Sequence, residues 1–283
     1  MNITPIDLHV HSIRSDGTLS PTELVSEAIQ AGLSAFALTD HDTVEGIDEA
    51  IQATTGTFVT CISGIELSTD FEGSEVHMVG LFIDHHNAAF LSRLQEFQDF
   101  RINRNRKMVN NLTQEGFDIS MEVLESTYPD SIITRAHMAR YLFDTKQVKK
   151  MKTVFEKYIG NDCRLYVPRE KISPFDAVDL IHSANGLAIL AHPVLYHMNA
   201  ARLDRLVGDL TIHGMDGIEA IYSTYSPGDE RNMKVLATKH HLLLSGGSDF
   251  HGSNKPMIHL GKGWGHLFVP SSFLDEMHHA LGH

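Results

Sequence analysis

Several short apolar runs of this sequence end in clusters of histidine and acidic residues. The clusters are Asp7-Leu-His9-Val-His11, Thr39-Asp40-His41-Asp42, Gly64-Ile-Glu66, Ala191-His192-Pro193 and Gly247-Ser-Asp249-Phe-His251. Segments with helical periodicity alternate with the runs, and this alternation is typical of βαβ units that build a parallel sheet. Because the carboxyl ends of parallel strands meet at one edge, we expect the clustered side chains to lie together there.

The alternation predicts seven strands, one fewer than in the usual eight-stranded barrel. The expected strands are Ile6–Leu8, Ala35–Thr39, Phe58–Glu66, Glu75–Phe82, Leu187–Ala191, Gly217–Ile221 and Leu242–Ser245. Two helix starts are marked by Ser20-Pro-Thr-Glu23, a capping box with proline at the first helical position, and by Ser173-Pro174. A chain of 283 residues suffices for one such barrel or for two ordinary domains.

The stretch from residue 88 to residue 157 has helical patterns only. A long charged helix is expected up to Gly116, a short one after Ser120, and two more over Ala136–Phe143 and Val148–Tyr158. Since connections within a barrel are short, this stretch predicts an inserted helical subdomain. We expect residues 1–87 and 166–283 to form a barrel, and residues 88–165 to form a helical insertion over its active-site mouth.

The charge balance argues against binding to long nucleic acid. The chain has 36 acidic residues against 23 Lys and Arg, a formal charge of −13, whereas long nucleic acid requires a net basic footprint. A local basic pocket that binds a small anion is still compatible with this net charge. The chain has two cysteines and no signal-peptide pattern, and no apolar run reaches the roughly 18 residues of a membrane span. We expect a cytoplasmic protein with no membrane contact and no obligate protein partner.

The clustered residues are typical metal ligands. Residues i and i+2 of a strand point to the same side, so His9 and His11 can reach one ion together. Asp249 and His251 can likewise reach two neighbouring ions. A lone histidine is more often packed in a core, but many ionisable groups in one mouth cannot be buried without cations to compensate their desolvation. The pattern therefore predicts bound divalent metals.

The same segments resemble the polymerase-and-histidinol-phosphatase (PHP) superfamily of metal-dependent phosphoesterases. The resemblance rests on the clusters given above and on Ser15-Asp16-Gly, and it extends from residue 7 to residue 251. It implies an α/β fold of the TIM-like kind, a distorted (β/α)7 barrel with a trinuclear metal site. The helical block and the run Ile133-Thr-Arg-Ala-His137 are similar to the branch that acts on nucleoside 3′,5′-bisphosphates, whose relatives trim short RNA from the 5′ end.

The resemblance also implies a set of ligands for each ion. His9, His11, Glu66 and Asp249 would hold the first metal, Glu66 would bridge to a second metal bound by His77 and His192, and Asp16, His41 and His251 would hold the third. Several superfamily members carry histidine in place of Asp16, and a carboxylate there favours Mn²⁺ or Fe²⁺ over Zn²⁺. We expect two or three divalent ions, with Mn²⁺ favoured, and we expect Asp7 and Asp40 to orient imidazoles from outside.

The resemblance implies an enzyme that hydrolyses the 3′-phosphate of nucleoside 3′,5′-bisphosphates. A divalent cluster lowers the pKa of bound water to about 7 and neutralises phosphoryl oxygens, which predicts in-line attack by a metal-bridging hydroxide. The candidates for the catalytic acid are Asp16, His137 and a metal-bound water.

Substrate binding requires a further cationic element. Arg135 follows Thr134 at the start of an expected helix, where its guanidinium and the helix amides could bind a second phosphate. Without the resemblance, an exposed arginine is the better interpretation. His137, Arg14 and Lys171 are further candidates for contact with the substrate. Basic residues of the helical block could form an anionic-ligand rim or a solvated face: Arg104, Arg106, Lys107, Lys149, Lys150 and Lys152.

Other functions remain as alternatives. A 5′–3′ exoribonuclease on short 5′-phosphorylated RNA and a histidinol-phosphatase-like phosphomonoesterase would use the same metals. A C–N amidohydrolase also begins with a His-x-His strand, but no lysine suited to a bridging carbamate is found in the fourth strand. A metal-binding scaffold without catalysis would lack ligands, and here the set is complete.

Overall fold

The protein is described by a computed structural model, which covers residues 3–129, 131–168 and 172–282. Its centre is an eight-stranded sheet in the order β7-β6-β5-β4-β3-β2-β1-β8. The strands are β1 (Pro5–Val10), β2 (Ala35–Leu38), β3 (Thr60–Phe71), β4 (Ser74–Leu81), β5 (Leu187–Leu190), β6 (Gly217–Tyr222), β7 (Leu243–Gly247) and β8 (Val269–Pro270). The described residues thus contain one strand more than predicted. Strand β8 has two residues and pairs antiparallel with β1, too short for a periodic pattern.

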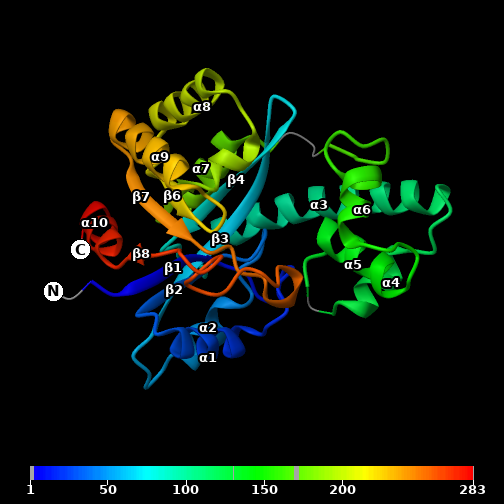
Figure 1. Cartoon of the computed structure of the whole chain (residues 1–283), viewed down its shortest axis with the longest axis horizontal. Helices are drawn as coiled ribbons and strands as arrows, with labels where there is room; N and C mark the ends of the chain where they lie inside the picture. Colours follow the sequence, from blue (N-terminus) through cyan, green and yellow to red (C-terminus); the bar gives the residue numbers. More distant parts are fainter. Residues whose placement is uncertain (1–2, 130, 169–171, 283) are drawn as a thin grey trace.

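The end of β7 meets the end of β1, which nearly closes the sheet into a barrel (Figure 1). Phe250, just beyond β7, forms a parallel bridge with Val10. The His11 amide donates to the Phe250 carbonyl at 3.0 Å, and the Asp249 amide donates to the His9 carbonyl at 2.8 Å. The expected α/β fold with a distorted (β/α)7 barrel is confirmed, and its closure brings residues 9–11 beside residues 249–251.

Strand β4 departs from the parallel arrangement that the sequence pattern indicated. It pairs antiparallel with both β3 and β5, so the expectation of parallel pairing was wrong there. The link from β3 to β4 is Glu72-Gly73, with Gly73 at φ 77°. A two-residue link allows a hairpin but no parallel crossover. His77 consequently reaches the site from within β4, opposite Ser68, rather than from a carboxyl end.

Helices surround the barrel (Figure 1). They are α1 (Pro21–Ala31), α2 (Ile47–Ala53), α7 (Pro174–Ser183), α8 (Ala200–His213), α9 (Pro227–His240) and α10 (Ser272–Ala280), with short 3-10 turns at Pro193–Tyr196 and Gly252–Asn254. The predicted capping box at Ser20 is formed, the helix predicted to start at Ser173 begins with a capping box as well, and Ser226 makes a third. Each serine side chain accepts a hydrogen bond from a backbone amide of the first turn, which fixes where the helix begins.

Two apolar clusters stabilise the barrel. Alternate residues of β2 show the division: Ala35 and Ala37 belong to the interior cluster, whereas Phe36 and Leu38 pack in the larger cluster beneath the helices. Burial of one such large side chain stabilises the fold by about 1.5–3 kcal/mol. The result is a stiff frame for the side chains at the strand ends.

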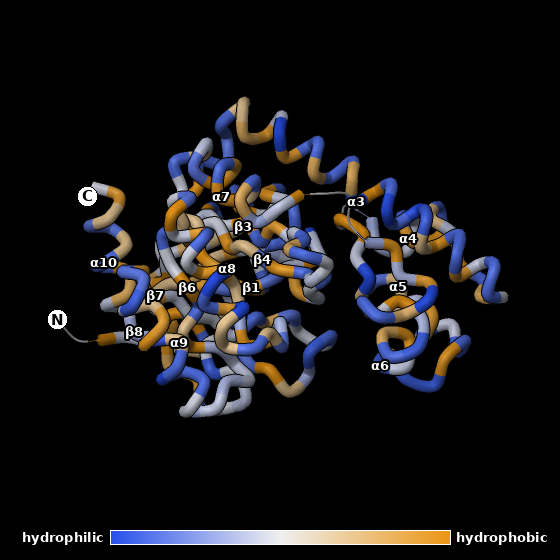
Figure 2. Tube along the Cα trace, turned by 90° about the horizontal axis from the view of Figure 1, so that it is seen from above, coloured by the Kyte–Doolittle hydropathy of each residue, from blue (hydrophilic) through white to orange (hydrophobic). Residues whose placement is uncertain are grey.

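The helical stretch forms a lobe beside the barrel (Figure 2). It consists of α3 (Ala88–Gln114), α4 (Met121–Thr127), α5 (Arg135–Asp144), α6 (Met151–Val154) and a π-helical turn at Phe155–Ile159. The helix expected from Val148 begins at Met151 and ends in that turn instead of continuing as an α-helix. Within the described ranges, no helix is both long and apolar enough to span a bilayer.

Helix α3 belongs to both parts of the molecule. Its first half contributes Phe90 and Leu94 to the cluster beneath the barrel helices, and its second half contributes Met108 and Leu112 to a third cluster shared with α4 and α5. Apolar side chains on one stripe of the helix are therefore buried along both halves. One continuous helix fixes the lobe against the mouth of the barrel.

Candidate metal centre and substrate cavity

Glu66 of β3 lies at the centre of the histidine cluster. Its Oε2 atom lies 3.3 Å from His9 Nε2, 3.3 Å from His11 Nε2 and 3.0 Å from His41 Nδ1, and its Oε1 atom lies 2.8 Å from His77 Nδ1 and 3.0 Å from His192 Nε2. The two oxygens of one carboxylate thus face different sets of imidazoles. Such a carboxylate is suited to bridging two ions.

Asp249 completes the group around the end of β1. Its Oδ1 atom lies 3.3 Å from His11 Nε2 and 3.7 Å from His9 Nε2. Its Oδ2 atom accepts a hydrogen bond from the Tyr222 hydroxyl at 2.5 Å and lies 2.5 Å from Lys255 Nζ. One oxygen therefore faces the histidines, while Tyr222 and Lys255 hold the other oxygen from outside the cluster.

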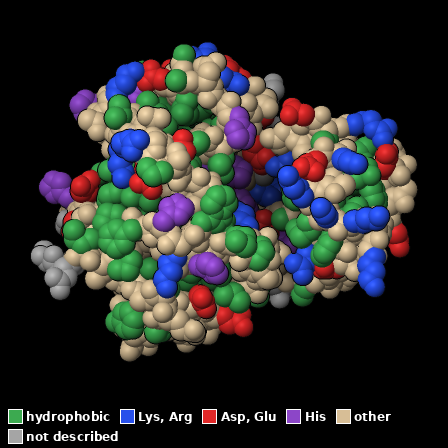
Figure 3. Space-filling model, viewed as in Figure 1, with side chains coloured by type: hydrophobic (Ala, Val, Ile, Leu, Met, Phe, Trp, Pro, Cys, Tyr) green, Lys and Arg blue, Asp and Glu red, His purple; other side chains and the backbone are tan. Residues whose placement is uncertain are grey.

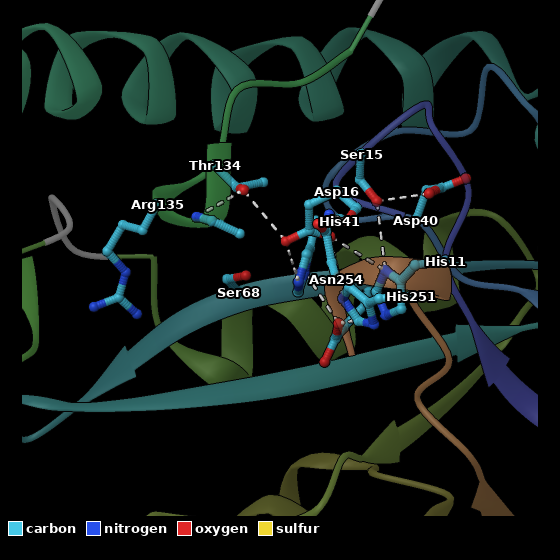
Figure 4. Close-up of polar contacts among 12 residues, drawn as sticks. His11, Ser15, Asp16, Asp40, His41, Ser68, Thr134, Arg135, His251 and Asn254 are labelled. Carbon is cyan, nitrogen blue, oxygen red and sulfur yellow. Dashed lines mark hydrogen bonds and ion pairs between the residues drawn. The ribbon is translucent and has the colours of Figure 1, made fainter. Parts of the chain in front are cut away.

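A further group surrounds Asp16, in the loop after β1 (Figure 4). Asp16 Oδ1 lies 3.2 Å from His251 Nε2, and Asp16 Oδ2 lies 3.9 Å from His41 Nε2. One donor atom from each of Asp16, His41, His251 and His11 lies within 4.8 Å of the others. All nine predicted metal ligands therefore lie in one connected cluster at the mouth of the barrel.

The donor atoms fit divalent ions. Metal–ligand distances of about 2.0–2.1 Å place neighbouring ligand atoms roughly 3.0–3.4 Å apart, which matches most of these separations. Among the described residues, the buried His9 Nε2, His11 Nε2, His41 Nδ1 and Asp16 Oδ1 atoms have no hydrogen-bond partner. Buried polar atoms are nearly always satisfied, so their convergence indicates that cations complete the site.

The electrostatics of the cluster agree with this interpretation. Burial alone would raise the pKa of Glu66, but His41, His9 and His77 hold it well below its usual range. The pKa of Asp249 is likewise lowered, because Lys255 and His251 outweigh the effect of burial. These carboxylates are ionised at neutral pH, and their charge favours bound cations.

Glu219 of β6 orients two of the histidines. Its Oε1 atom lies 2.9 Å from His9 Nδ1, and its Oε2 atom accepts a hydrogen bond from the His192 amide at 2.6 Å. A carboxylate at Nδ1 leaves the Nε2 lone pair of His9 free for a metal. The sequence analysis missed Glu219, although it is the one charged residue in the apolar strand Gly217–Tyr222.

Asp7 supports backbone rather than an imidazole ring, which corrects its expected role, whereas Asp40 reaches the His11 ring through the Ser15 hydroxyl, which lies 3.4 Å from His11 Nδ1. Asp7 accepts hydrogen bonds from the amides of Ser248 at 2.8 Å and Gly261 at 2.7 Å. Asp40 accepts from the Ser12 amide at 2.8 Å and from the Ser15 hydroxyl at 2.6 Å. Burial raises the pKa of Asp7 to about 6, although these hydrogen bonds oppose the rise. Both carboxylates hold the loops that carry the predicted ligands.

Several of these loops have a strained backbone. Asp42, His192 and Asp249 have φ values of 53°, 31° and 55°, in the left-handed region that non-glycine residues rarely adopt. Each such residue costs of the order of 1–3 kcal/mol. The surrounding structure therefore holds these side chains in fixed directions next to the cluster.

A cavity of about 250 Å³ opens from the cluster toward the helical lobe. Asp16, His41, His77 and His251 line it on the barrel side, and Arg101, Arg104 and Arg135 line it from α3 and α5. In the space-filling view, histidine and basic side chains meet in the hollow between the barrel and the lobe (Figure 3). The cavity thus combines a centre suited to cations with a cationic wall suited to an anionic substrate.

Arg104 of α3 and Arg135 of α5 both lie next to Tyr166 in this wall. Each guanidinium carbon lies 5.4 Å from the ring centroid of Tyr166. Arg135 forms an ion pair with Glu75 and donates to Asn161 Oδ1 at 2.8 Å. Arg104 is only 3% exposed and donates from Nε to the Val167 carbonyl at 2.9 Å, and its Nη2 atom has no hydrogen-bond partner among the described residues. Burial lowers the pKa of Arg104 to about 10.

Two further predicted substrate residues, Arg14 and His137, do not line the cavity. Arg14 lies 3.3 Å from Glu49. His137 is buried at the start of α5, where its Nδ1 atom accepts a hydrogen bond from the Thr134 amide at 3.1 Å and its ring stacks on Tyr128. Lys171 lies outside the described residues.

Lys255 and Arg101 also line the cavity but were absent from the sequence prediction. Lys255 follows the last ligand cluster by a few residues and has no pattern that marks it. Arg101 and Arg104 occupy the same stripe of α3 as Phe97 and Met108, at spacings of three and four residues. Arginines on an apolar helical stripe are a signal that could have been used.

Comparisons with known proteins agree with this site. The family model described as PHP domain matches residues 7–241. The 3′,5′-nucleoside bisphosphate phosphatase of Chromobacterium violaceum is 37% identical over 250 residues, 87% of each chain. The 5′–3′ exoribonuclease Rnm of Escherichia coli is 34% identical over 258 residues, 90% of this chain and 88% of its own.

Two solved structures have the same fold. A Chromobacterium violaceum protein designated an amidohydrolase, with bound sulfate and no metal, is 36% identical with a TM-score of 0.84, over 91% of this chain and 90% of its own. A protein from Bifidobacterium adolescentis, provisionally designated a metal-dependent phosphoesterase, is 28% identical with a TM-score of 0.84, over 96% and 94%. The family match covers most of the chain, and this protein therefore belongs to the PHP domain family.

Proposed function

We propose that the protein is a metal-dependent phosphoesterase that removes the 3′-phosphate of nucleoside 3′,5′-bisphosphates. One observation carries the proposal: a histidine–carboxylate cluster and the cationic wall with Arg104 and Arg135 face the same cavity. A substrate with two phosphates could place one phosphate at the cluster and the other at the cationic wall. The name of the Chromobacterium violaceum relative, a 3′,5′-nucleoside bisphosphate phosphatase, supports the same substrate.

The cluster has ligands for two or three divalent ions, and we propose Mn²⁺ as the principal one. His9, His11, Glu66 and Asp249 would hold the first, Glu66 with His77 and His192 the second, and Asp16, His41 and His251 the third. When bound, such ions neutralise phosphoryl oxygens and lower the pKa of water. The carboxylate of Asp16, an oxygen ligand, favours the harder ions Mn²⁺ and Fe²⁺ over Zn²⁺.

The protein's own residues would position the second phosphate. Arg104 has a buried Nη2 donor without a partner in the described part of the chain, and a buried donor gains most from a charged acceptor. Arg135 would share the phosphate from the other side of Tyr166. The lobe of residues 88–165, which supplies both arginines, would act as a wall over the mouth of the barrel.

The candidates for the catalytic acid are Asp16, His137 and a metal-bound water, and the two side chains have different surroundings. Asp16 lines the cavity and accepts a hydrogen bond from the Thr134 hydroxyl at 3.2 Å. His137 is packed behind Thr134, and burial lowers its pKa to about 4. Asp16 is thus the one of the two that a substrate could touch directly, while His137 holds the loop that contacts Asp16. Burial would raise the pKa of Asp16, but His251 and His41 hold it well below its usual range, so Asp16 is ionised at neutral pH and has no proton to donate.

Two other activities stay open. The similarity to Rnm supports short 5′-phosphorylated RNA as a second candidate substrate, because a phosphate at the arginine wall would be common to both. The solved relative that is designated an amidohydrolase suggests C–N hydrolysis as another activity. Strand β4 contains no lysine that could form a bridging carbamate, and Glu66, whose two oxygens face different imidazoles, would take the bridging position.

A cytoplasmic location is part of the proposal. Cys61 and Cys163 are both free, as expected for a reducing compartment.

The test is phosphate release with Mn²⁺ on four compounds: adenosine 3′,5′-bisphosphate, AMP, histidinol phosphate and a 5′-phosphorylated RNA dinucleotide. We expect the bisphosphate to have the highest kcat/KM. A preference for histidinol phosphate would overturn the choice of substrate. No turnover of any compound, together with hydrolysis of an amide, would overturn phosphoester chemistry.

A further inference from the structure

We infer that Asp48, His85 and His86 form a separate site for a transition-metal ion of the Zn²⁺ or Cu²⁺ type, on the outer side of the barrel. Asp48 lies in the first turn of α2, and the histidines lie in the turn between β4 and α3. None of the three lines the cavity at the barrel mouth.

Both imidazoles point at a single oxygen. His85 Nε2 lies 3.0 Å and His86 Nε2 lies 3.2 Å from Asp48 Oδ1. Adjacent residues in an extended chain point to opposite sides, but in this turn the two ring centroids lie 4.2 Å apart with an interplanar angle of 39°. One donor atom of each residue lies within 4.8 Å of the other two, as in the groups of predicted ligands at the mouth of the barrel.

The separations suit coordination. Metal–ligand distances of about 2.0–2.1 Å for imidazole and carboxylate place neighbouring ligand atoms roughly 3.0–3.4 Å apart. Two nitrogens and one carboxylate favour Cu²⁺ and Zn²⁺, since Mg²⁺ and Ca²⁺ prefer oxygen ligands only. The side chain of His85 is 13% exposed while those of His86 and Asp48 are 68% and 69% exposed. The ion would therefore be open to solvent on one side, with water in the remaining positions.

The turn that carries the histidines is fixed by its own hydrogen bonds. The Asp84 amide donates to the Ala184 carbonyl at 2.7 Å, and Asp84 Oδ1 accepts from the His86 amide at 3.2 Å. On the other side, the Asn87 side chain caps α3 and donates to the Ser183 carbonyl at 3.1 Å. Little backbone movement is required to form the site, which reduces the entropy lost when the ion binds.

Zn²⁺ binding to the full-length protein tests the inference. Equilibrium dialysis against Zn²⁺ would compare the wild type with the double variant His85→Ala/His86→Ala. The matched control is His278→Ala/His279→Ala, an adjacent pair at the end of α10 that belongs to no group of converging ligands in the described chain. Both double variants lose two histidines, so loss of nonspecific binding affects them equally.

We expect one Zn²⁺ fewer per chain in the first double variant and no change in the control. Asp48→Asn should weaken the same ion about tenfold or more, because it removes the anionic ligand and leaves the histidines in place. Circular dichroism and the Mn²⁺-supported phosphate release should match wild type in all these variants, which shows that the catalytic cluster is intact. Equal Zn²⁺ stoichiometry in the wild type and in His85→Ala/His86→Ala would overturn the inference.

Discussion

Arg101 of α3 forms an ion pair with Asp42, the residue that follows His41, and both side chains are buried. The Gln98 side chain donates to the Asp42 carbonyl at 2.9 Å, so one face of α3 holds both ends of this residue. Asp42 has the left-handed backbone described above. The helix that forms the wall of the cavity thus also fixes the loop that presents His41.

Replacing Arg101 with methionine should impair both stability and metal binding. Removal of Arg101 takes away the cationic partner of the buried Asp42 carboxylate, to which the Ser68 amide still donates at 3.2 Å, and the loss of one partner of a buried pair typically costs about 3–5 kcal/mol. Urea unfolding would measure the loss, and Mn²⁺ dialysis would measure the weaker binding caused by a mobile His41. The exposed Arg93 on the same helix is the control, and Arg93→Met should have no effect. Equal stability of the two variants would contradict a structural role for the pair.

Replacing Arg104 should impair the binding of bisphosphates selectively. A hydrogen bond to a charged group contributes about 1.5–3 kcal/mol, so Arg104→Met should lower kcat/KM for adenosine 3′,5′-bisphosphate by roughly 10–100-fold, mostly through KM. The loss for 3′-AMP, which lacks the second phosphate, should be much smaller. Arg106→Met, on the exposed side of α3, serves as the control. An equal loss for both nucleotides would mean that Arg104 does not bind the second phosphate.

Changing Glu219 to glutamine should weaken metal binding without removing a ligand. The variant exchanges the carboxylate at His9 Nδ1 for an amide, and loss of such an outer partner typically costs 10–100-fold in metal affinity. Mn²⁺ titration of the phosphatase activity would show a higher metal requirement, with kcat largely restored at saturation. Glu276→Gln in α10 is a control at an exposed position. Unchanged Mn²⁺ affinity would show that Glu219 only supports the strand.

His137 should make stability depend on pH in mildly acidic solution. Burial lowers its pKa to about 4; Asp16 opposes the shift, and Arg101 and His251 reinforce it. In the unfolded chain its pKa is about 6.5. Above pH 6.5 its contribution to stability is fully present, and it is lost as the pH falls toward 4, by about 3 kcal/mol.

The pH effect can be isolated by comparing unfolding free energies of the wild type and His137→Gln at several pH values. The difference in unfolding free energy between the two proteins should shrink as the pH falls from 6.5 to 4, because the variant has no imidazole at position 137 to protonate. Phosphate release should fall in step with the loss of folded protein. A loss of more than 100-fold in kcat with unchanged stability would instead assign His137 to catalysis.

The sequence predicted the barrel and the cluster because both leave local signals. Strand-end ligands such as His9 and Glu66 interrupt apolar runs, and the i, i+2 spacing of His9 and His11 is visible without a structure. The antiparallel course of β4 could have been inferred from the two-residue link at Glu72-Gly73. Strand β8 could not, since two residues carry no period.

The arginine wall was predicted only in part. Arg135 was found through a family resemblance, whereas Arg104 was one of six basic residues that could form either an anionic-ligand rim or a solvated helical face. Its burial depends on contacts between α3 and residues near Val167, more than 60 positions away along the chain. Such long-range packing is not encoded in a local pattern.

The continuous helix α3 has a consequence for how ligands reach the metal centre. Helix α3 is a continuous rod anchored in two hydrophobic cores, so a bend between barrel and lobe would have to interrupt its hydrogen bonds, which favours a gap of constant width. Compounds would be sorted by their dimensions before any chemistry occurs. A rigid inhibitor that spans the gap would lose little entropy on binding, and shortening or kinking the rod would be a direct way to alter which molecules are admitted.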